Sequence, residues 1–185
     1  MADITITVSK PRSAAAALEP SPEGELYFDL IELLFFAYRD FVGDPDEVLA
    51  RLGFGRAHHR VLHFVNRNPG IKVADLLDVL KITKQSLGRV LKQLIDEGYV
   101  AQKEGAHDRR QRLLYVTPAG EALAVKLAGL QTARIDRVLA ELGPGAREAA
   151  RRFLAGMIDA DDRDHVLRLI ADADRARQRG RDRGS

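Results

Sequence analysis

Hydrophobic side chains recur at helical spacing along most of this chain, and short polar segments separate the apolar stretches. The first predicted helix covers residues 25–42, where large apolar side chains occupy nearly the whole circumference. A helix of this kind is covered from several sides. We therefore expect a dimer interface here, which the small size of the chain favours, or else the central core helix of a monomer.

Two shorter amphipathic helices are predicted over residues 55–66 and 73–80, and a three-residue turn then leads into a helix over residues 84–97. Thr83 suits the N-cap of that helix, because its hydroxyl oxygen can accept a hydrogen bond from a free backbone N–H group. A short helix, a tight turn and a longer helix form a helix–turn–helix, in which the second helix reads DNA.

The helix over residues 84–97 has one apolar and one polar face. Its apolar stripe consists of Leu87, Val90, Leu91, Leu94 and Ile95. The opposite face carries Gln85, Arg89, Lys92 and Asp96, with Ser86 and Gln93 at its edges. Guanidinium, amide and hydroxyl groups match the donors and acceptors of base edges in the major groove. The alternative is an ordinary solvated helix face, which this pattern alone does not separate from a DNA-reading one.

Two short strands are predicted over residues 99–104 and 112–116, from their β-branched and aromatic residues. The polar segment between them contains Arg109 and Arg110, whose side chains suit a narrow minor groove. Asp108 is expected to brace a neighbouring arginine. A basic hairpin beside a DNA-reading helix defines a winged helix–turn–helix, so the predicted fold is mainly α with a small β-wing.

Two long helical segments follow the hairpin. Thr117 and Pro118 suit the N-cap and first position of a helix that ends at Gly143-Pro144-Gly145. A last helical stretch starts near Ala146, with a kink predicted near residues 159–162. We interpret residues 118–174, together with 25–42, as dimerisation helices around a winged helix over residues 52–117. Residues 25–174 are thus predicted to form a single domain.

Both ends of the chain are predicted to be tails. Residues 1–24 contain three prolines and a run of four alanines within positions 11–22, without an amphipathic period. Residues 175–185 are basic and hold no large apolar side chain, so burial cannot offset the entropy of ordering them. We expect the first tail to be disordered and the second to fray.

Charge is unevenly distributed along the chain. The 185 residues include 29 Lys and Arg against 27 Asp and Glu, a net charge of +2 that is too small for a general cationic coat. Residues 81–115 hold eight Lys and Arg against four Asp and Glu, a net of +4, which leaves −2 for the rest. This segregation favours a surface that follows a phosphate backbone.

Several classes of protein are excluded or disfavoured by what the sequence lacks. Without cysteine there is no disulfide scaffold, thiolate metal site or thiol redox chemistry. The sequence has neither a run of 18 apolar residues nor a secretory signal, which predicts a cytoplasmic location. A small helical enzyme is disfavoured, because no nucleophile elbow, phosphate loop, HExxH motif or paired carboxylates are found.

A series of short motifs resembles the MarR family of bacterial transcription regulators over roughly residues 25–170. The motifs are Leu52-Gly53-Phe54, Arg60-Val61-Leu62, Val73-Ala74-Asp75-Leu76-Leu77, Thr83 through Leu91, Gly98-Tyr99-Val100, Asp108-Arg109-Arg110 and Thr117-Pro118-Ala119-Gly120. The resemblance implies a homodimer joined through its terminal helices, which places two recognition helices on a palindromic DNA site. It also implies a small-molecule pocket between the dimer helices and the DNA-binding lobe.

The same resemblance implies roles for individual residues. The family's recognition positions fall on Thr83, Lys84, Gln85, Ser86 and Arg89, and its wing pair falls on Asp108 and Arg110. Lys92 and Arg109 join the candidate DNA contacts through their charge and position. The family's peroxide sensors use a reactive cysteine, which this chain lacks, so a thiol switch is not implied.

The histidines near residue 60 leave the sensing function open. Phe35, Tyr38, Arg39, His58 and His59 are candidates for an apolar pocket with polar anchors for an organic anion. His59 and His63 are four residues apart, which suggests a metal or haem site that also uses His58. In the third interpretation, which we favour, His58 packs in the core and the other two form hydrogen bonds. No cofactor is predicted.

The sequence therefore predicts a dimeric, sequence-specific DNA-binding regulator without enzymatic activity. A repressor modulated by a small molecule is favoured. The alternatives are a winged helix that docks its basic wing onto an acidic protein, and a haem- or metal-responsive regulator.

Overall fold

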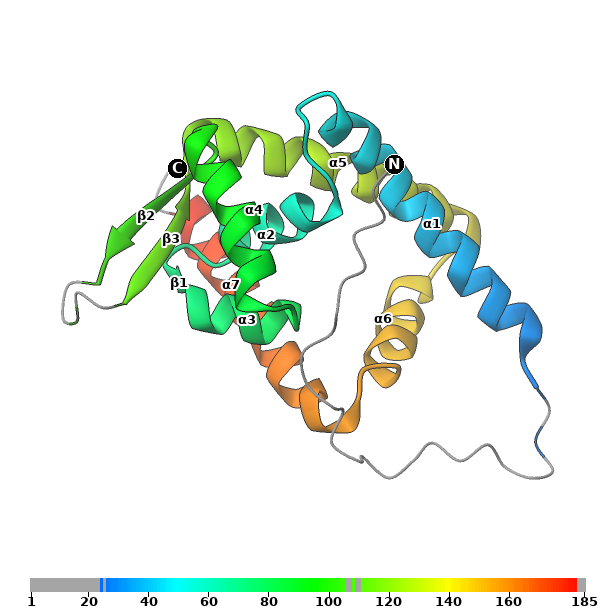
Figure 1. Ribbon diagram of the computed structural model, residues 1–185. Coiled ribbons are helices and arrows are strands. Elements are labelled where there is room, and N and C mark those ends of the chain that lie inside the picture. The colour runs from blue at the N-terminus through cyan, green and yellow to red at the C-terminus, as the bar shows by residue number, and fades with distance from the viewer. Residues whose placement is uncertain (1–23, 25, 106–107, 109–110, 183–185) are drawn as a thin grey trace. The chain divides into compact units, whose positions relative to one another are not determined.

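The computed structural model describes residues 24, 26–105, 108 and 111–182. These residues form helices and a three-stranded antiparallel sheet (Figure 1), which confirms the predicted class of mainly α with a small β-wing. They divide into two units, one extending to Ile135 and the other starting at Asp136. The boundary between these units falls within residues 118–142, and the single domain over residues 25–174 stays a prediction. The predicted N-terminal tail lies outside the described residues except for Gly24.

The first unit contains the elements of the winged helix. They are α1 (Phe28–Ala50), α2 (Arg56–Arg67), β1 (Ile71–Lys72), α3 (Val73–Leu80), α4 (Lys84–Asp96), β2 (Val100–Glu104), β3 (Arg112–Val116) and most of α5 (Pro118–Leu142). The bounds of α3 are those predicted, those of α2 are shifted by one residue at both ends, and α4 ends one residue earlier than predicted. The helix–turn–helix is therefore α3, the turn at residues 81–83, and α4.

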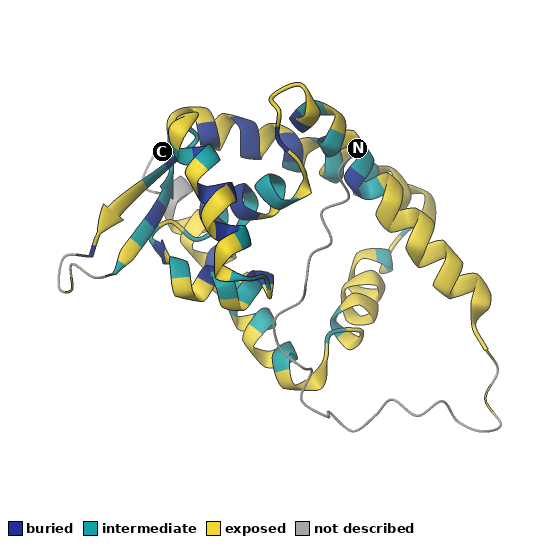
Figure 2. Cartoon of the chain, viewed as in Figure 1, coloured by how far each residue is buried: buried dark blue, intermediate teal, exposed yellow. Residues whose placement is uncertain are grey.

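One hydrophobic core joins α2, α3, α4, α5 and the sheet (Figure 2). Its most deeply buried members include Val61, Leu62, Val65, Leu76, Leu87, Leu94, Val100, Leu114 and Leu127. The stripe predicted for α4 is the face that enters this core, since Leu87, Val90, Leu91 and Leu94 are buried and Ile95 packs against the cluster. Removing this apolar area from water fixes which side of α4 faces outward.

The strands are ordered β1-β3-β2, with antiparallel pairing throughout. In the wing, Val100 lies opposite Val116 and Glu104 opposite Arg112. The two residues of β1 were not predicted, because so short a strand shows no alternation of polar and apolar positions. Its pairing of Ile71 with Leu114 attaches the start of α3 to the sheet.

The first helix is longer than predicted. The predicted helix ended at Val42, but α1 continues through Gly43 and Pro45 to Ala50. Proline removes the backbone N–H group that would bond the carbonyl four residues earlier, at Phe41. The Phe41 carbonyl accepts a hydrogen bond from the Gln131 side chain of α5 at 3.5 Å instead, so the helix passes through the proline without leaving that group unpaired.

The second unit contains α6 (Ala146–Gly156) and α7 (Ala160–Asp182). The predicted kink is a break between these helices, where the Arg163 guanidinium donates to the carbonyls of Gly156 and Ile158 at 2.9 and 3.0 Å. The predicted fraying from residue 175 is wrong as far as Asp182, because α7 continues to that residue. Arg, Ala and Gln favour helix intrinsically, and an ion pair between Arg175 and Asp172 spans one helical turn.

Candidate nucleic-acid interface

Local hydrogen bonds fix the turn that starts α4. Lys81 has a left-handed backbone with φ of 51°, and the Arg60 guanidinium donates to the preceding carbonyl of Leu80 at 3.1 Å. Thr83 is the predicted N-cap: its hydroxyl oxygen accepts from the Ser86 N–H group at 3.1 Å, and the hydroxyl donates to the Ser86 side chain at 2.9 Å. The first turn of α4 is thus held before any ligand binds.

The outward face of α4 carries the predicted polar residues. Lys84, Gln85, Arg89 and Lys92 are exposed, and Ser86 is partly buried by its bond to Thr83. Lys92 forms an ion pair with Asp96 one turn further along the helix. Among the described residues, Arg89 has no hydrogen-bond or ion-pair partner, so its guanidinium remains available to a ligand.

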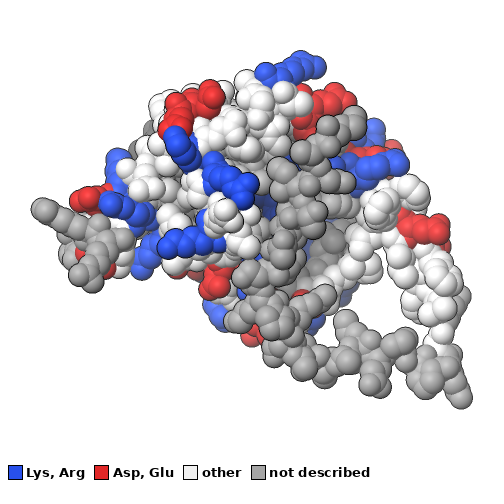
Figure 3. All heavy atoms as spheres, viewed as in Figure 1, with Lys and Arg blue, Asp and Glu red and all other residues white. Residues whose placement is uncertain are grey.

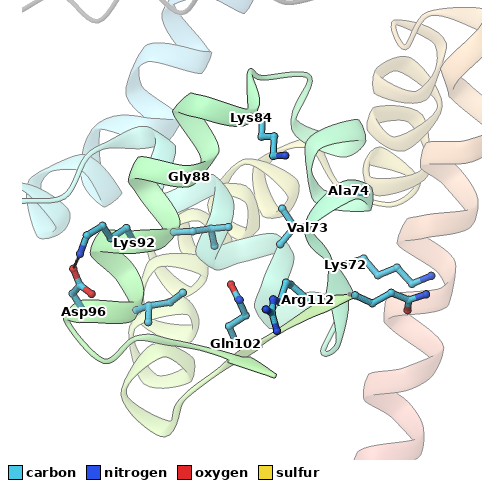
Figure 4. A pocket seen from close by; sticks show the side chains of 12 residues that line it. Lys72, Val73, Ala74, Lys84, Gly88, Lys92, Asp96, Gln102 and Arg112 are labelled. Carbon is cyan, nitrogen blue, oxygen red and sulfur yellow. Dashed lines mark hydrogen bonds and ion pairs between the residues drawn. The ribbon is translucent and has the colours of Figure 1, made fainter. Parts of the chain in front are cut away.

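A groove of about 680 Å³ lies between α4, the start of α3 and the wing. Figure 4 shows the side chains around it: Lys84 and Lys92 extend from α4, Arg112 from β3 and Lys72 from β1. The remaining lining residues include Gln102 and Gln111 of the wing and an apolar floor at Val73, Leu91 and Ile95. The rim thus carries four cations and the Asp96 carboxylate above an uncharged floor.

Four cations surround this groove. Arg112 is paired across the wing with Glu104, Nη1 to Oε1 at 2.9 Å, and Lys92 with Asp96, whereas Lys72 and Lys84 are exposed. Figure 3 shows Lys and Arg side chains gathered over α3, α4 and the sheet. Sequence reasoning did not select Lys72 or Arg112 as site residues. The positive charge of residues 81–115 included Arg112, but only the unpredicted β1 brings Lys72 to this groove.

The base of the wing tip is closed by backbone hydrogen bonds. Gly105 N–H donates to the Gln111 carbonyl, and Gln111 N–H to the Asp108 carbonyl, both at 3.0 Å. Gly105 is required here, because a Cβ atom would lie 2.8 Å from the Asp108 carbonyl oxygen. Asp108 is exposed, and its two predicted partners in DNA binding, Arg109 and Arg110, lie outside the described residues.

The residues predicted to bind an organic anion lie on α1 and α2. Phe35 and Tyr38 are exposed on α1, and Arg39 pairs with Asp40 at 2.7 Å and lies over the Phe36 ring. His58 on α2 instead contacts α4: its Nε2 atom lies 2.8 Å from the Gln93 side-chain oxygen, and its Nδ1 atom accepts from the Gly55 N–H group at 3.1 Å. Both ring nitrogens of His58 are therefore engaged within the protein.

The other two histidines lie partly buried on α2. Burial lowers the pKa of His59, and the Asp46 carboxylate partly offsets that effect. Burial, and then the nearby His59 and Arg67, lower the pKa of His63 to about 4. Across the described part of the chain, no three His, Asp or Glu side chains are grouped to hold a metal ion.

The fold and this surface define a winged helix–turn–helix protein of the class that binds DNA. A family model described as MarR family matches residues 52–111. The transcriptional regulator PetP of Rhodobacter capsulatus is 44% identical over 144 residues, which cover 78% of this chain and 86% of the relative. The transcriptional repressor Rv2887 of Mycobacterium tuberculosis is 32% identical over 104 residues, covering 56% and 75%.

The chain belongs to the MarR family of transcription regulators. Solved structures show the same fold at low identity. The regulator SlyA has a TM-score of 0.61 at 18% identity, covering 75% of this chain and 99% of that one. NadR in complex with 4-hydroxyphenylacetate has a TM-score of 0.60 at 21% identity, covering 75% and 95%. These relatives are regulators and not enzymes, as predicted. No helix within the described residues has the length and apolar character to span a membrane.

Proposed function

We propose that the protein is a homodimeric repressor that binds a palindromic DNA site. The recognition helix α4 enters the major groove, and the wing tip at residues 105–111 enters the minor groove. The observation that carries this proposal is the outward polar face of α4, which the buried stripe holds beside a cationic groove. A helix in the major groove needs such a rigid, exposed face.

The candidate contacts divide by chemistry. Arg89 and Gln85 face outward and are proposed to contact base edges, because a guanidinium can bond guanine in a bidentate manner and an amide can bond adenine. Charged and hydroxyl groups are proposed to contact phosphates, which positions the protein without reading sequence. These are Lys72, Thr83, Lys84, Ser86, Lys92 and Arg112. In the wing, Arg109 and Arg110 are proposed to enter the minor groove, and Asp108 is proposed to brace a neighbouring arginine.

The proposed dimer rests on uncovered apolar surface. On α1, large apolar side chains from Phe28 to Tyr38 are exposed around the helix, with Ile31 at 62% and Phe35 at 69%. Exposed apolar residues also occur in α5 and α6, among them Leu142 and Phe153. A surface of this extent marks an interaction site in a folded protein. A second copy of the chain is its proposed occupant, through helices in residues 25–42 and 118–174.

Repression and ligand control extend this proposal by analogy. Rv2887 is named a repressor, and NadR is described with bound 4-hydroxyphenylacetate. We infer that this chain also represses, in the cytoplasm where bacterial DNA lies, and that a small organic acid lowers its DNA affinity by favouring a different spacing of the recognition helices. Calorimetric titration with aromatic carboxylates tests the effector, and a bound acid that leaves DNA affinity unchanged contradicts it.

Selection from random duplexes tests the DNA-binding proposal. The purified protein is expected to enrich a palindrome whose half-site spacing reports the dimer. Arg89→Ala should then weaken binding to the selected site by about 1–3 kcal/mol and relax the preference at the affected base pair. Arg51→Ala, which removes an exposed arginine outside the groove, is the matched control. Failure to enrich any sequence favours the docking of the wing onto a protein partner.

A further inference from the structure

A continuous chain of hydrogen bonds joins the loop before α2 to the recognition helix. The Gly55 N–H group donates to His58 Nδ1 at 3.1 Å, and His58 Nε2 lies 2.8 Å from Gln93 Oε1. The Gln93 side-chain nitrogen in turn donates to the Gly53 carbonyl at 3.3 Å. The side chains of His58 and Gln93 thereby link α4 to loop residues up to 40 positions away.

The direction of each hydrogen bond is fixed by the first. Because Nδ1 accepts from a backbone N–H group, it carries no proton, and the neutral ring must carry its proton on Nε2. Nε2–H then donates to the Gln93 oxygen, which turns the amide nitrogen toward the Gly53 carbonyl. The neutral imidazole can form each of these hydrogen bonds. A protonated ring would also carry a proton on Nδ1, which would face the N–H donor of Gly55.

Aromatic packing holds the imidazole in place. The His58 ring is stacked on Phe54 with centroids 4.8 Å apart and planes at 14°. Phe54 is buried and meets Tyr99 edge-to-face at 5.3 Å, and the Tyr99 N–H group bonds the Leu94 carbonyl of α4 at 2.8 Å. The ring is therefore fixed against both the loop and the C-terminal end of α4.

The hydrogen-bonded chain restrains the rotation of α4 about its own axis, which the apolar stripe alone restrains only weakly. Aliphatic packing is non-directional, so Leu87 and Leu91 hold α4 against the core without fixing a precise rotation about its axis. A side chain at the helix edge is about 5–6 Å from the axis, and a 10° rotation moves it by about 1 Å. Displacements of this size exceed the tolerance of a binding constellation. Gln93 lies one turn beyond Arg89, where a directional bond to α2 opposes such rotation.

We propose that His58 and Gln93 form a positioning pair that sets the rotation of α4, and with it the alignment of Arg89 on its base pair. This inference rests on the proposed DNA-reading function. Neither residue contacts DNA in this role. Loss of the pair lowers affinity for the selected operator more than for unrelated duplexes, because phosphate contacts tolerate a small rotation better than bidentate base contacts do.

Two substitutions of His58 each keep one of the two hydrogen bonds of its ring and remove the other. His58→Gln places an amide nitrogen where Nε2 lies and keeps the bond to Gln93, whereas His58→Asn places an oxygen near Nδ1 and keeps only the bond from Gly55. We expect His58→Asn and Gln93→Leu each to weaken operator binding about tenfold. The double variant should lose no more than either alone, and His58→Gln should stay within about twofold of wild type. His59→Asn, on the same helix, is the matched control.

Operator and unrelated-duplex affinities are measured on protein shown to be folded by chemical unfolding. The proposed positioning role is wrong if His58→Asn and Gln93→Leu lose affinity equally for both duplexes. It is also wrong if they lower the free energy of unfolding but leave operator affinity unchanged. A His59→Asn variant that behaves like His58→Asn overturns it as well. If His58→Asn does not fold, the contrast between His58→Gln and Gln93→Leu decides the matter in the same assays.

Two further readouts separate this inference from its premise. The imidazole ¹⁵N shifts of His58 should show protonated Nε2 and unprotonated Nδ1 in the free protein, and the opposite tautomer overturns the pair. A wild-type protein that selects no DNA sequence overturns the proposed function itself. One that selects a palindrome but tolerates Gln93→Leu without loss overturns the pair alone.

Discussion

Side chains on the exposed side of α4 differ in how far the protein already uses them. Thr83 and Ser86 are bonded to each other, Lys92 is paired with Asp96, and Arg89 has no partner among the described residues. A group already bonded within the protein must break that bond to bind DNA, or contact it with its remaining atoms. Arg89 is consequently the residue of this face from which DNA binding gains most.

Lys72 is expected to contact phosphate without reading sequence. Lys72→Ala should weaken binding to operator and unrelated duplexes alike, and should make the slope of log affinity against log salt shallower by about 0.9. Fluorescence anisotropy over a range of salt concentrations measures that slope. Lys126→Ala removes the same charge from an exposed position of α5 away from the groove. An identical change in slope for both variants would contradict the proposed contact between Lys72 and a DNA phosphate.

His63 is expected to make the fold sensitive to acid. Its pKa is lowered from 6.5 to about 4 in the folded protein, mainly by burial, so the unfolded chain binds the proton more readily. Stability is unaffected well above pH 6.5 and falls as the pH drops from there toward 4, by up to about 3 kcal/mol. Chemical unfolding at pH 7, 5.5 and 4 gives the free energies. His63→Gln should flatten this pH dependence, and an equally steep curve in that variant contradicts the assignment.

Sequence and structure agree best where a residue acts through its neighbours in the chain. Thr83 as an N-cap and the stripe from Leu87 to Leu94 depend on local spacing, and both were predicted. The contact between His58 and Gln93 joins residues 35 positions apart, and Lys72 reaches the groove through a two-residue strand. No periodicity marks such tertiary contacts, so the sequence indicated the recognition helix but not what orients it.

At the scale of elements, the junction between α4, the wing and α5 depends on very close backbone packing. The Thr117 hydroxyl donates to the Gly98 carbonyl at 2.6 Å and accepts from the Gly120 N–H group at 3.1 Å, while the Thr117 N–H group donates to the Tyr99 carbonyl at 3.0 Å. One threonine therefore caps α5 and fastens it to the chain that leaves α4. The sequence predicted this cap but not the close approach that it produces.

Gly120→Ala is expected to disrupt this junction. The added Cβ atom would lie 2.0 Å from the Tyr99 carbonyl oxygen, a backbone atom that cannot move without shifting β2. We expect the free energy of unfolding to fall by about 3 kcal/mol or more. Gly129→Ala on the same helix meets nothing within 4 Å and should stabilise by about 0.5–1 kcal/mol. Urea unfolding of both variants measures these changes, and similar values for the two would contradict the packing argument.

Two predicted element ends were wrong, for different physical reasons. The predicted end at Val42 was too early: α1 continues through Pro45, and Gln131 bonds the carbonyl that the proline leaves free. Residues 175–182 lack large apolar side chains, yet they are helical because their intrinsic propensity is high. Glycines that act as stops, such as Gly143 with φ of 78°, were predicted correctly because a left-handed residue ends a helix by itself.

At the scale of the whole molecule, the chain has a cationic surface, proposed to bind DNA, and an apolar surface, proposed to form the dimer. Cations gather around the groove of the winged helix, while apolar side chains cover α1 and recur in α5 and α6. The near balance of positive and negative residues in the overall composition concealed the first, and counting charge by segment revealed it. The apolar residues around nearly the whole circumference of residues 25–42 indicated the second, with a dimer interface and the core helix of a monomer as the two interpretations.

Ile31→Glu is expected to weaken the proposed dimer. Ile31 is 62% exposed on α1, and a carboxylate placed at an apolar interface must lose its hydration without a partner. We expect the dimer dissociation constant to rise at least about tenfold, with a parallel loss of affinity for the full palindrome. Sedimentation equilibrium measures the dissociation constant. Glu32→Gln, at the next exposed position, is the control, and a wild-type chain that sediments as a monomer would contradict the proposed assembly.

The exposed apolar surface of α1 makes repression by the proposed dimer depend steeply on the concentration of the chain. If two chains must meet before either can hold an operator, the assembled species rises with the square of chain concentration while most chains are single. Halving synthesis then removes about three quarters of the assembled species. A modest change in gene dosage or turnover would therefore relieve the controlled promoter more sharply than the same change in a regulator that works alone.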